Sequence, residues 1–514
     1  MVTMDFSGFS AATLTLLITL ICLLVVYGYR PVGFFEKLGI PGPKPVPFLG
    51  SLGEYVQGIA AMDLNNFKKY GRIWGFFEGH HPVLATVDTK MIKTIFVKEC
   101  FTNFTNRRYF RFLGKMNNSL SNVHGATWRR GRSAISPLFS GSRLKEVFVL
   151  MEPHSEKLVK NLQVKDSCEE GLDIHEIWTD FCLDALVGAI LSIDTDAISN
   201  PKNPTVVRMK RTFKFDFTNP ILGLSVIFPF LDPLLEMGNL SVFPKADMDS
   251  FYAAFEKVKE DREKGVQKDR VDFLKMMLES QLSNSVISES NIDAHGNALK
   301  GLTHYEILCT MMIFLLGGLE TTSKSLAFVA HSLATNPDVM KKLLDEIDGV
   351  LPEKTPLTYE KLAAMEYLDM VLYETLRLYP VLQRLERVCT KTININGVTV
   401  PKGTVVTVPL HALHQDPQLW PEPDIFNPER FSKENRIRMD PYAFLPFGAG
   451  PRNCIGMRFA RILMKLPLVQ VLRQFSFAAC TETEVPLQLD IAPILSPKNP
   501  IKVKLVPRGP VTKG

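Results

Sequence analysis

The sequence predicts a mainly α-helical protein with small β-sheets (α+β), plus one transmembrane helix at its N-terminus. Three observations lead to this prediction. An uncharged apolar run covers residues 9–27. A short alternating unit, residues 392–409, contains an Asn396-Gly397 pair that favours a type I′ hairpin. Apolar residues recur at helical spacing in four segments: 305–335, 337–350, 358–379 and 454–475.

The N-terminal run is long enough to span a membrane. As a helix rising about 1.5 Å per residue, it would extend roughly 28 Å, close to the thickness of the bilayer core. A cleaved signal peptide is the alternative, but it needs a basic start. The only charged side chain in residues 1–10 is that of Asp5, which is acidic. Because Arg30, Lys37 and Lys44 follow the run, we expect a lumenal N-terminus and a cytoplasmic main body.

The predicted domains follow from this anchor. Residues 1–28 are the anchor, and residues 29–50 form a proline-rich linker in which PGPKPVP forbids a helix. No second linker is evident, so residues 51–514 are expected to form a single domain. Within it, Pro467 predicts a bend in the helix expected over 454–475, since proline removes a helical hydrogen bond.

Composition excludes several classes of protein. With 46% hydrophobic and 22% charged residues, the 514-residue chain is neither disordered nor collagen-like. A net charge of +5 is too small to indicate a nucleic-acid partner. The eight cysteines are widely spaced, which indicates reduced thiols. The ten histidines form no HExxH motif, so a zinc hydrolase is not expected.

One cysteine stands in a distinctive loop. Residues 447–456 read FGAGPRNCIG and place Cys454 at an expected helix start, behind two glycines that let the backbone turn tightly. Free N–H groups at a helix start favour a thiolate, so Cys454 is a candidate metal ligand. A buried structural cysteine is one alternative. A phosphate-binding loop is another, although Asn453 stands where its third glycine would be.

The pattern F-x-x-G-x-R-x-C-x-G resembles the haem-binding loop of cytochromes P-450, the haem-thiolate monooxygenases. Three further motifs of that family follow in the expected order: GGLETT at 317–322, Glu374-x-x-Arg377, and PERF at 428–431. Segments such as EYLDMVLYETLRLYP (366–380) are most similar to vertebrate family three, the microsomal drug and steroid hydroxylases. The resemblance covers essentially the whole chain.

The resemblance implies a P-450 fold with haem b (iron protoporphyrin IX) between the long central helix and the Cys-loop helix. Residues 51–514 would then be a single haem-binding catalytic domain. Cys454 would be the axial thiolate ligand of the iron. Thr321 and Glu320 would relay protons during dioxygen cleavage. Glu374 and Arg377, three residues apart on one helix, would form a structural triad with Arg430. The implied cofactor-binding residues are Arg107, Trp128, Arg132, Arg387, Arg452, Phe447 and Gly318.

The substrate pocket is also implied by the resemblance. Its expected wall positions are Phe110, Ser121, Phe215, Phe217, Leu316, Leu382 and Gln383, together with Thr321. Two residues depart from the family pattern. Gly317 stands where alanine is more common, which would widen the local groove, and Gln383 adds a polar group that would alter selectivity.

The predicted activity is hydroxylation or other oxidation of lipophilic substrates (steroids, xenobiotics, lipids) with O2 and two electrons from NADPH. The implied partners are NADPH-cytochrome P-450 reductase, possibly cytochrome b5, and membrane lipid, and the expected location is the endoplasmic reticulum membrane. A haem-thiolate isomerase or dehydratase is a second hypothesis, which the retained Glu320-Thr321 pair disfavours. A non-catalytic electron-transfer haem protein is a third.

Overall fold

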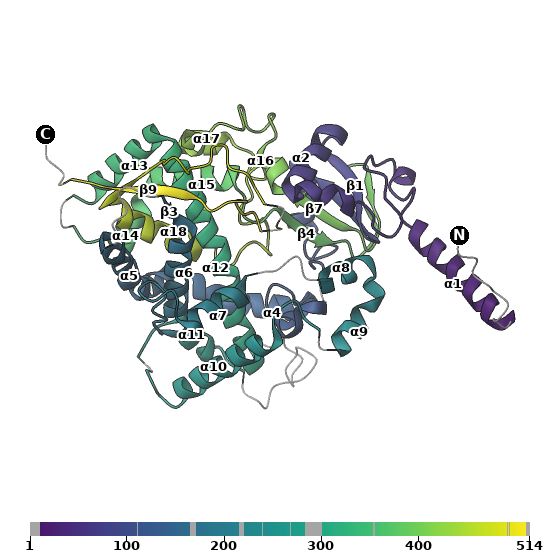
Figure 1. The fold of residues 1–514 in the computed structure, drawn as a ribbon, viewed down its shortest axis with the longest axis horizontal. Helices are drawn as coiled ribbons and strands as arrows, with labels where there is room; N and C mark the ends of the chain where they lie inside the picture. Colours follow the sequence, from purple (N-terminus) through teal and green to yellow (C-terminus); the bar gives the residue numbers. More distant parts are fainter. Residues whose placement is uncertain are drawn as a thin grey trace, which may run out of the picture.

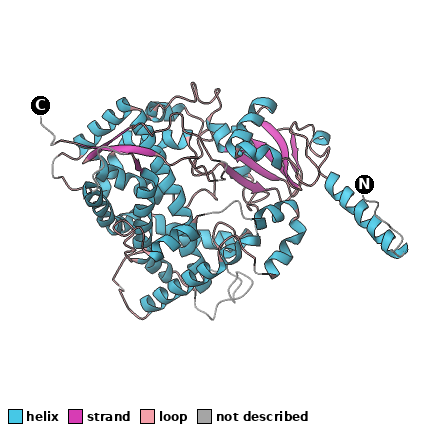
Figure 2. Ribbon diagram, viewed as in Figure 1, coloured by secondary structure: helices cyan, strands magenta, loops and turns pink. Residues whose placement is uncertain are grey.

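A computed structural model of the chain describes residues 11–109, 111–164, 171–214, 220–238, 240–267, 269–282, 301–352, 355–490, 492 and 494–509. Helices form most of the body, and the described strands form three small sheets, of four, three and two strands (Figures 1 and 2). The mainly α class with small sheets is therefore confirmed.

The longer helices are α1 (Ala11–Tyr29), α2 (Ile59–Tyr70), α4 (Gly125–Ile135), α5 (Gly141–Val164), α6 (Ile174–Leu191), α7 (Pro204–Phe213), α8 (Pro220–Ile227), α10 (Lys245–Glu263), α12 (His304–Thr335), α13 (Pro337–Val350), α15 (Glu366–Leu378) and α18 (Met457–Leu472). The shorter helices are α3 (Thr89–Lys93), α9 (Asp232–Met237), α11 (Phe273–Glu279), α14 (Tyr359–Ala364), α16 (Leu410–His414) and α17 (Lys433–Arg438). The strands are β1 (Ile73–Glu78), β2 (His81–Thr86), β3 (Leu172–Asp173), β4 (Arg384–Val388), β5 (Ile393–Ile395), β6 (Val398–Val400), β7 (Val405–Pro409), β8 (Phe475–Ala478) and β9 (Lys502–Pro507).

Helix α1 projects from the body of the protein, with its apolar side chains exposed (Figure 1). It is uncharged and long enough to cross a membrane. Helix α12 also passes a test of length and hydropathy, but most of it is buried in the protein. The exposed apolar helix α1 fits the predicted membrane anchor.

The linker does not stand away from the globule. The N–H of Gly75 on β1 donates to the carbonyl of Pro41 at 2.8 Å. The ring of Phe35 is buried against Gly75, where a side chain would leave no room for it. Phe35 and Pro41 of the predicted linker therefore pack against strand β1.

The main helical core surrounds α12, which crosses the body and packs against α6, α15 and α18. Its predicted start at residue 305 is one residue off, and α13 has the predicted bounds. A capping box fixes the start of α12, because the Thr303 hydroxyl accepts from the Glu306 N–H and the Glu306 carboxylate accepts from the Thr303 N–H.

The single helix predicted over 358–379 is wrong, because the chain breaks at Met365. This residue has an extended backbone and separates α14 from α15. The Glu346 carboxylate, from α13, accepts from the backbone N–H groups of Tyr367 and Leu368 at 2.7 and 2.9 Å. A side chain from another helix thus supplies the cap that starts α15.

The last long helix begins later than predicted. Helix α18 starts at Met457, so Cys454 lies in the turn before the helix and not at its first residue. It ends at Leu472, and residues 475–478 form strand β8. Pro467 is buried inside α18, and the bend predicted there stays a prediction.

The predicted hairpin is confirmed: β5 and β6 pair antiparallel, and Asn396 and Gly397 both have positive φ, as a type I′ turn requires. The expectation of one unit over 392–409 is wrong, however. Strand β7 joins a separate sheet of order β1-β2-β7-β4, pairing parallel with β2 and antiparallel with β4. This sheet carries a second hydrophobic core beside the helical one.

Candidate active site

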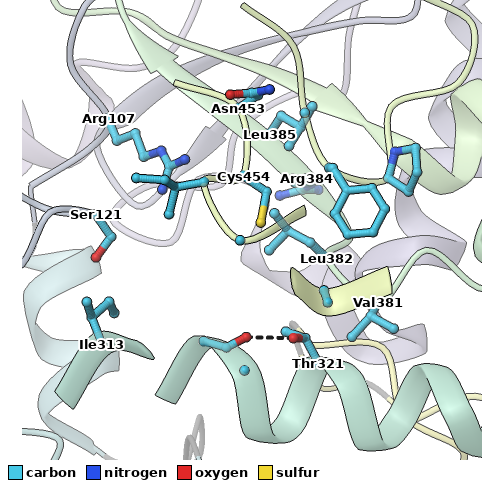
Figure 3. A pocket seen from close by; sticks show the side chains of 18 of the residues that line it. Arg107, Ser121, Ile313, Thr321, Val381, Leu382, Arg384, Leu385, Asn453 and Cys454 are labelled. Atoms are coloured by element: carbon cyan, nitrogen blue, oxygen red, sulfur yellow. Dashed lines mark hydrogen bonds between the residues drawn. The ribbon is translucent and has the colours of Figure 1, made fainter. Parts of the chain in front are cut away.

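A cavity of about 1390 Å³ lies between α12 and the Cys454 loop (Figure 3). Most of the predicted site residues line it: Arg107, Ser121, Trp128, Arg132, Gly318, Thr321, Leu382, Gln383, Arg387, Phe447, Arg452 and Cys454. Leu316 and Glu320 do not line it, and Phe110, Phe215 and Phe217 lie outside the described residues. We call residues 447–456 the proximal wall and residues 313–325 of α12 the distal wall.

Tight backbone packing shapes the proximal wall. Gly450 has φ +69°, and a Cβ atom built there would lie 1.9 Å from the carbonyl oxygen of Phe96. Only glycine fits such a position without displacing the backbone. The Cys454 N–H then donates to the Phe447 carbonyl at 2.8 Å, which closes the loop around the cysteine.

The Cys454 side chain points into the cavity, toward the helix that carries Thr321 (Figure 3). Its exposed surface therefore faces the cavity. Burial raises the pKa of the thiol, while the Gly456 N–H and the guanidinium groups of Arg107 and Arg132 oppose that rise. Cys454 is the only cysteine among the described residues that line the cavity.

Four of the predicted arginines line the cavity: Arg107, Arg132, Arg387 and Arg452. Arg132 donates to the Asn453 carbonyl and side-chain oxygens at 2.9 and 2.7 Å, and Arg107 donates to the Arg452 carbonyl at 3.2 Å. The guanidinium of Arg452 stacks 4.3 Å from the centre of the buried Trp128 ring. Within the described chain, no carboxylate makes an ion pair with any of these arginines.

Burial, followed by repulsion from neighbouring arginines, lowers the pKa of both Arg387 and Arg452 to about 9. The Nε atoms of the same two residues are buried and find no acceptor in the part of the chain that the structure describes. Buried cations require paired charge. The cluster thus has the chemistry to bind an anionic ligand.

A buried ion cluster holds the chain behind the proximal wall. Glu374 and Arg377 are fully buried and form two contacts of 2.7 and 2.8 Å. Arg430 lies 3.3 Å from the same carboxylate. Arg377 also donates to the carbonyl of His414 at the end of α16 and to the carbonyls of Pro423 and Ile425 in the irregular segment that follows it. The structure thus brings the three predicted residues together and uses them to brace that segment.

The distal wall is a continuous helix whose residues face different surroundings. The Thr321 hydroxyl lines the cavity and donates to the Gly317 carbonyl at 2.6 Å (Figure 3). Glu320 is buried behind the wall, where its carboxylate lies 2.7 Å from the ammonium of Lys324. Only Thr321 of the predicted catalytic pair therefore faces the cavity directly.

The expected substrate wall is only partly assembled. Ser121 and Leu382 line the cavity, and Leu316 packs against the helical core instead. Gln383 is buried, and its side-chain N–H donates to the carbonyl of Ala492. One of the two N–H donors of the Gln383 amide is thus used within the chain.

Sequence reasoning missed a second group of charges on the cavity wall. Arg108 and Arg384 both contact Glu78, and Arg108 also lies 3.0 Å from Glu386. Arg384 makes a further pair with the buried Asp63 at 2.7 Å. These residues come from α2, β1, β4 and the segment before α4, so no local motif connects them. The three charged residues within the short strand RLERV were the one available signal.

Comparisons with known proteins agree with this geometry. The sequence model of the family described as "Cytochrome P450" matches residues 40–505. The chain belongs to the cytochrome P450 family. It is 48% identical over 505 residues to cytochrome P450 3A30 of Fundulus heteroclitus, covering 98% of this chain and 100% of that one. It is 46% identical over 508 residues to cytochrome P450 3A2 of Rattus norvegicus, covering 99% of each.

Proteins of this P450 family are oxidoreductases of the monooxygenase class, and they use haem with an axial cysteine thiolate. The cavity fits that group. Its proximal wall presents a cysteine sulfur, and its rim carries guanidinium Nε atoms that have no acceptor among the described residues. The two carboxylates of a haem would supply the missing negative charge.

Proposed function

We propose that the protein oxidises lipophilic substrates such as steroids, xenobiotics and lipids, inserting one oxygen atom of O2 into a C–H bond. The second oxygen atom leaves as water, and NADPH supplies the two electrons through a flavoprotein reductase. The observation that carries the proposal is the cavity itself, with Cys454 on one wall and Thr321 on the opposite wall (Figure 3).

Haem, when bound, supplies the iron that activates dioxygen. Cys454 would hold that iron through its thiolate sulfur. The propionates would be held by five residues that line the same cavity: Arg107, Trp128, Arg132, Arg387 and Arg452. The four arginines have no ion-pair partner within the described chain, so they could pair with the propionates. Phe447 and Gly318 contribute surface on the two opposite walls.

Proton supply falls to the distal wall. The Thr321 hydroxyl donates to its own helix, which leaves its oxygen lone pairs free to accept a hydrogen bond from the cavity side. Glu320 lies one residue away and is held by Lys324. We assign Thr321 to orient the proton donor at the reacting oxygen, and Glu320 to return protons from behind the helix.

The lining indicates what kind of substrate enters. Apolar side chains such as Ile313, Val381 and Leu382 border the cavity beside the reacting centre, so shape and apolar burial hold the substrate there. The charges of Glu78, Arg108 and Arg384 also line the cavity. They satisfy one another, which leaves lipophilic molecules as the favoured class.

Helix α1 would anchor the protein in the endoplasmic reticulum membrane as a single span. The basic residues that follow it support a lumenal N-terminus and a cytoplasmic catalytic domain. NADPH-cytochrome P-450 reductase would then be the electron donor, with cytochrome b5 as a second candidate. Residues 51–514 would form the single catalytic domain, and nothing in the charge balance favours nucleic acid.

Turnover of the full-length protein with reductase, NADPH and isotopically labelled dioxygen tests the proposal. A monooxygenase transfers one labelled oxygen atom to a steroid or drug and consumes one NADPH per product. An isomerase or dehydratase would form product without NADPH or O2, which would contradict the proposal. The Thr321→Val variant should release more peroxide per NADPH, and Thr321→Ser should restore coupling, because serine keeps the hydroxyl.

A further inference from the structure

Two neighbouring glycines on α12 have opposite surroundings. A Cβ atom built on Gly318 would lie 2.8 Å from the Leu186 side chain of α6, so the close approach of the two helices accounts for that glycine. A Cβ atom built on Gly317 would meet nothing within 4 Å. Gly317 lines the cavity, and its φ angle is in the normal helical range.

Neither packing nor backbone conformation therefore explains Gly317. Glycine inside a helix is less stable than alanine, so an alanine here would strengthen α12 at no steric cost to the protein. The bond from the Thr321 hydroxyl uses the carbonyl of Gly317 and would form equally well with an alanine. What the glycine does provide is space, one methyl group deep, on the wall opposite Cys454.

We propose that Gly317 is a specificity-determining residue that admits a branched carbon centre beside the reacting atom. A substrate with a tertiary or quaternary carbon next to the oxidised position needs room on the α12 side of the cavity. The neighbouring wall residues Ile313 and Thr321 are β-branched and cannot supply it. The inference rests on the proposed function, because it takes the reacting atom to lie between Cys454 and α12.

Two isomeric probes isolate this effect. n-Butyl and tert-butyl isocyanide are isomers that both bind reduced haem iron through the terminal carbon, but only the second is branched at the carbon attached to the isocyanide nitrogen. Its three methyl groups surround the binding axis, so rotation cannot relieve a contact on one side. Both probes are titrated into the reduced full-length haem protein and followed by the Soret band.

The matched variants are Gly317→Ala and Gly349→Ala, which both replace a helical glycine whose Cβ would meet nothing within 4 Å. In Gly317→Ala, tert-butyl isocyanide should bind about tenfold more weakly, as expected for one methyl group in a shaped pocket, while n-butyl isocyanide changes less than about twofold. The thermal midpoint should rise by about 1–2 °C, since alanine favours the helix. Gly349 lies on α13, outside the cavity lining, so Gly349→Ala should leave the affinities of both probes unchanged.

An unchanged ratio of the two affinities in Gly317→Ala would overturn the inference, whether both affinities stay the same or both weaken equally. A wild-type protein that shows no haem Soret band at all would contradict the proposed function instead, together with the inference that rests on it. The two failures are therefore distinguishable in a single titration.

Discussion

The two walls of the cavity keep their shapes in different ways. The distal wall is a regular helix whose backbone hydrogen bonds lie within itself. The proximal wall is an irregular loop, and the segment behind it depends on buried ions and on bonds between distant parts of the chain. A helix can change a side chain without changing its path, so the distal wall can vary the cavity while the proximal wall fixes the cysteine.

The largest expected effect tests the brace behind the proximal wall. Arg377→Met should destabilise the protein by about 4 kcal/mol, because the buried Glu374 carboxylate loses its nearest counter-ion and three carbonyls lose their donor. Thermal unfolding and the yield of haem-containing protein measure the loss. Arg438→Met, at an exposed position on α17, is the control. Equal stability of the two variants would show that the brace is unimportant.

The distal wall contains one buried ion pair, and breaking it sharpens the comparison. Lys324→Met should cost about 3 kcal/mol, since it leaves the Glu320 carboxylate buried without a counter-ion. The double variant Glu320→Gln with Lys324→Met should recover most of that stability, because no buried charge remains. If the single and double variants unfold alike, the pair does not stabilise α12.

A smaller effect is expected where the proximal backbone is tightest. Gly450→Ala combines a positive φ with a contact to the Phe96 carbonyl, and should cost about 2–4 kcal/mol. The control is Gly397→Ala in the β5–β6 turn, which has φ +86° and open space around it, and should cost only about 1–2 kcal/mol. Equal costs would mean that the approach to Phe96 is not tight in solution.

Mild acid should weaken the segment behind the proximal wall, where α16 carries His411 and His414. Burial, followed by repulsion from Arg377, lowers the pKa of His411 to about 4 and that of His414 to about 3. Below the unfolded pKa of about 6.5, the unfolded chain binds protons that the folded protein does not. Stability contributed by these neutral rings is fully present above that pH and is lost as the pH falls from about 6.5 toward 4.

Each of the two histidines should contribute a slope of about 1.4 kcal/mol per pH unit in that window. Denaturant unfolding at pH 7, 6 and 5 measures it. His411→Gln should reduce the slope of unfolding free energy against pH by the contribution of one histidine, about 1.4 kcal/mol per pH unit. An unchanged slope would contradict the assignment to this residue.

The sequence predicted those features that local pattern determines. The start of α12, the bounds of α13 and the β5–β6 turn follow from capping, periodicity and an Asn-Gly pair, which are all contained in short segments. The motif around Cys454 likewise identifies the cysteine without knowledge of the fold.

Features set by distant residues were not predictable. The break at Met365 depends on Glu346 of another helix, and the fate of strand β7 depends on β2, some 320 residues earlier in the chain. The different roles of Gly317 and Gly318 appear only when Leu186 is in place beside one of them. In each case the deciding contact has no trace in the local sequence.

The most direct test of the account is the carbon monoxide difference spectrum of the reduced full-length protein. With Cys454 as the axial ligand, the wild type should show the red-shifted Soret band of a thiolate-ligated haem. Cys454→Ser should lose that band, and Cys480→Ser, at a half-buried cysteine outside the cavity lining, should keep it. A red-shifted band that persists in Cys454→Ser would contradict the assignment of the cavity.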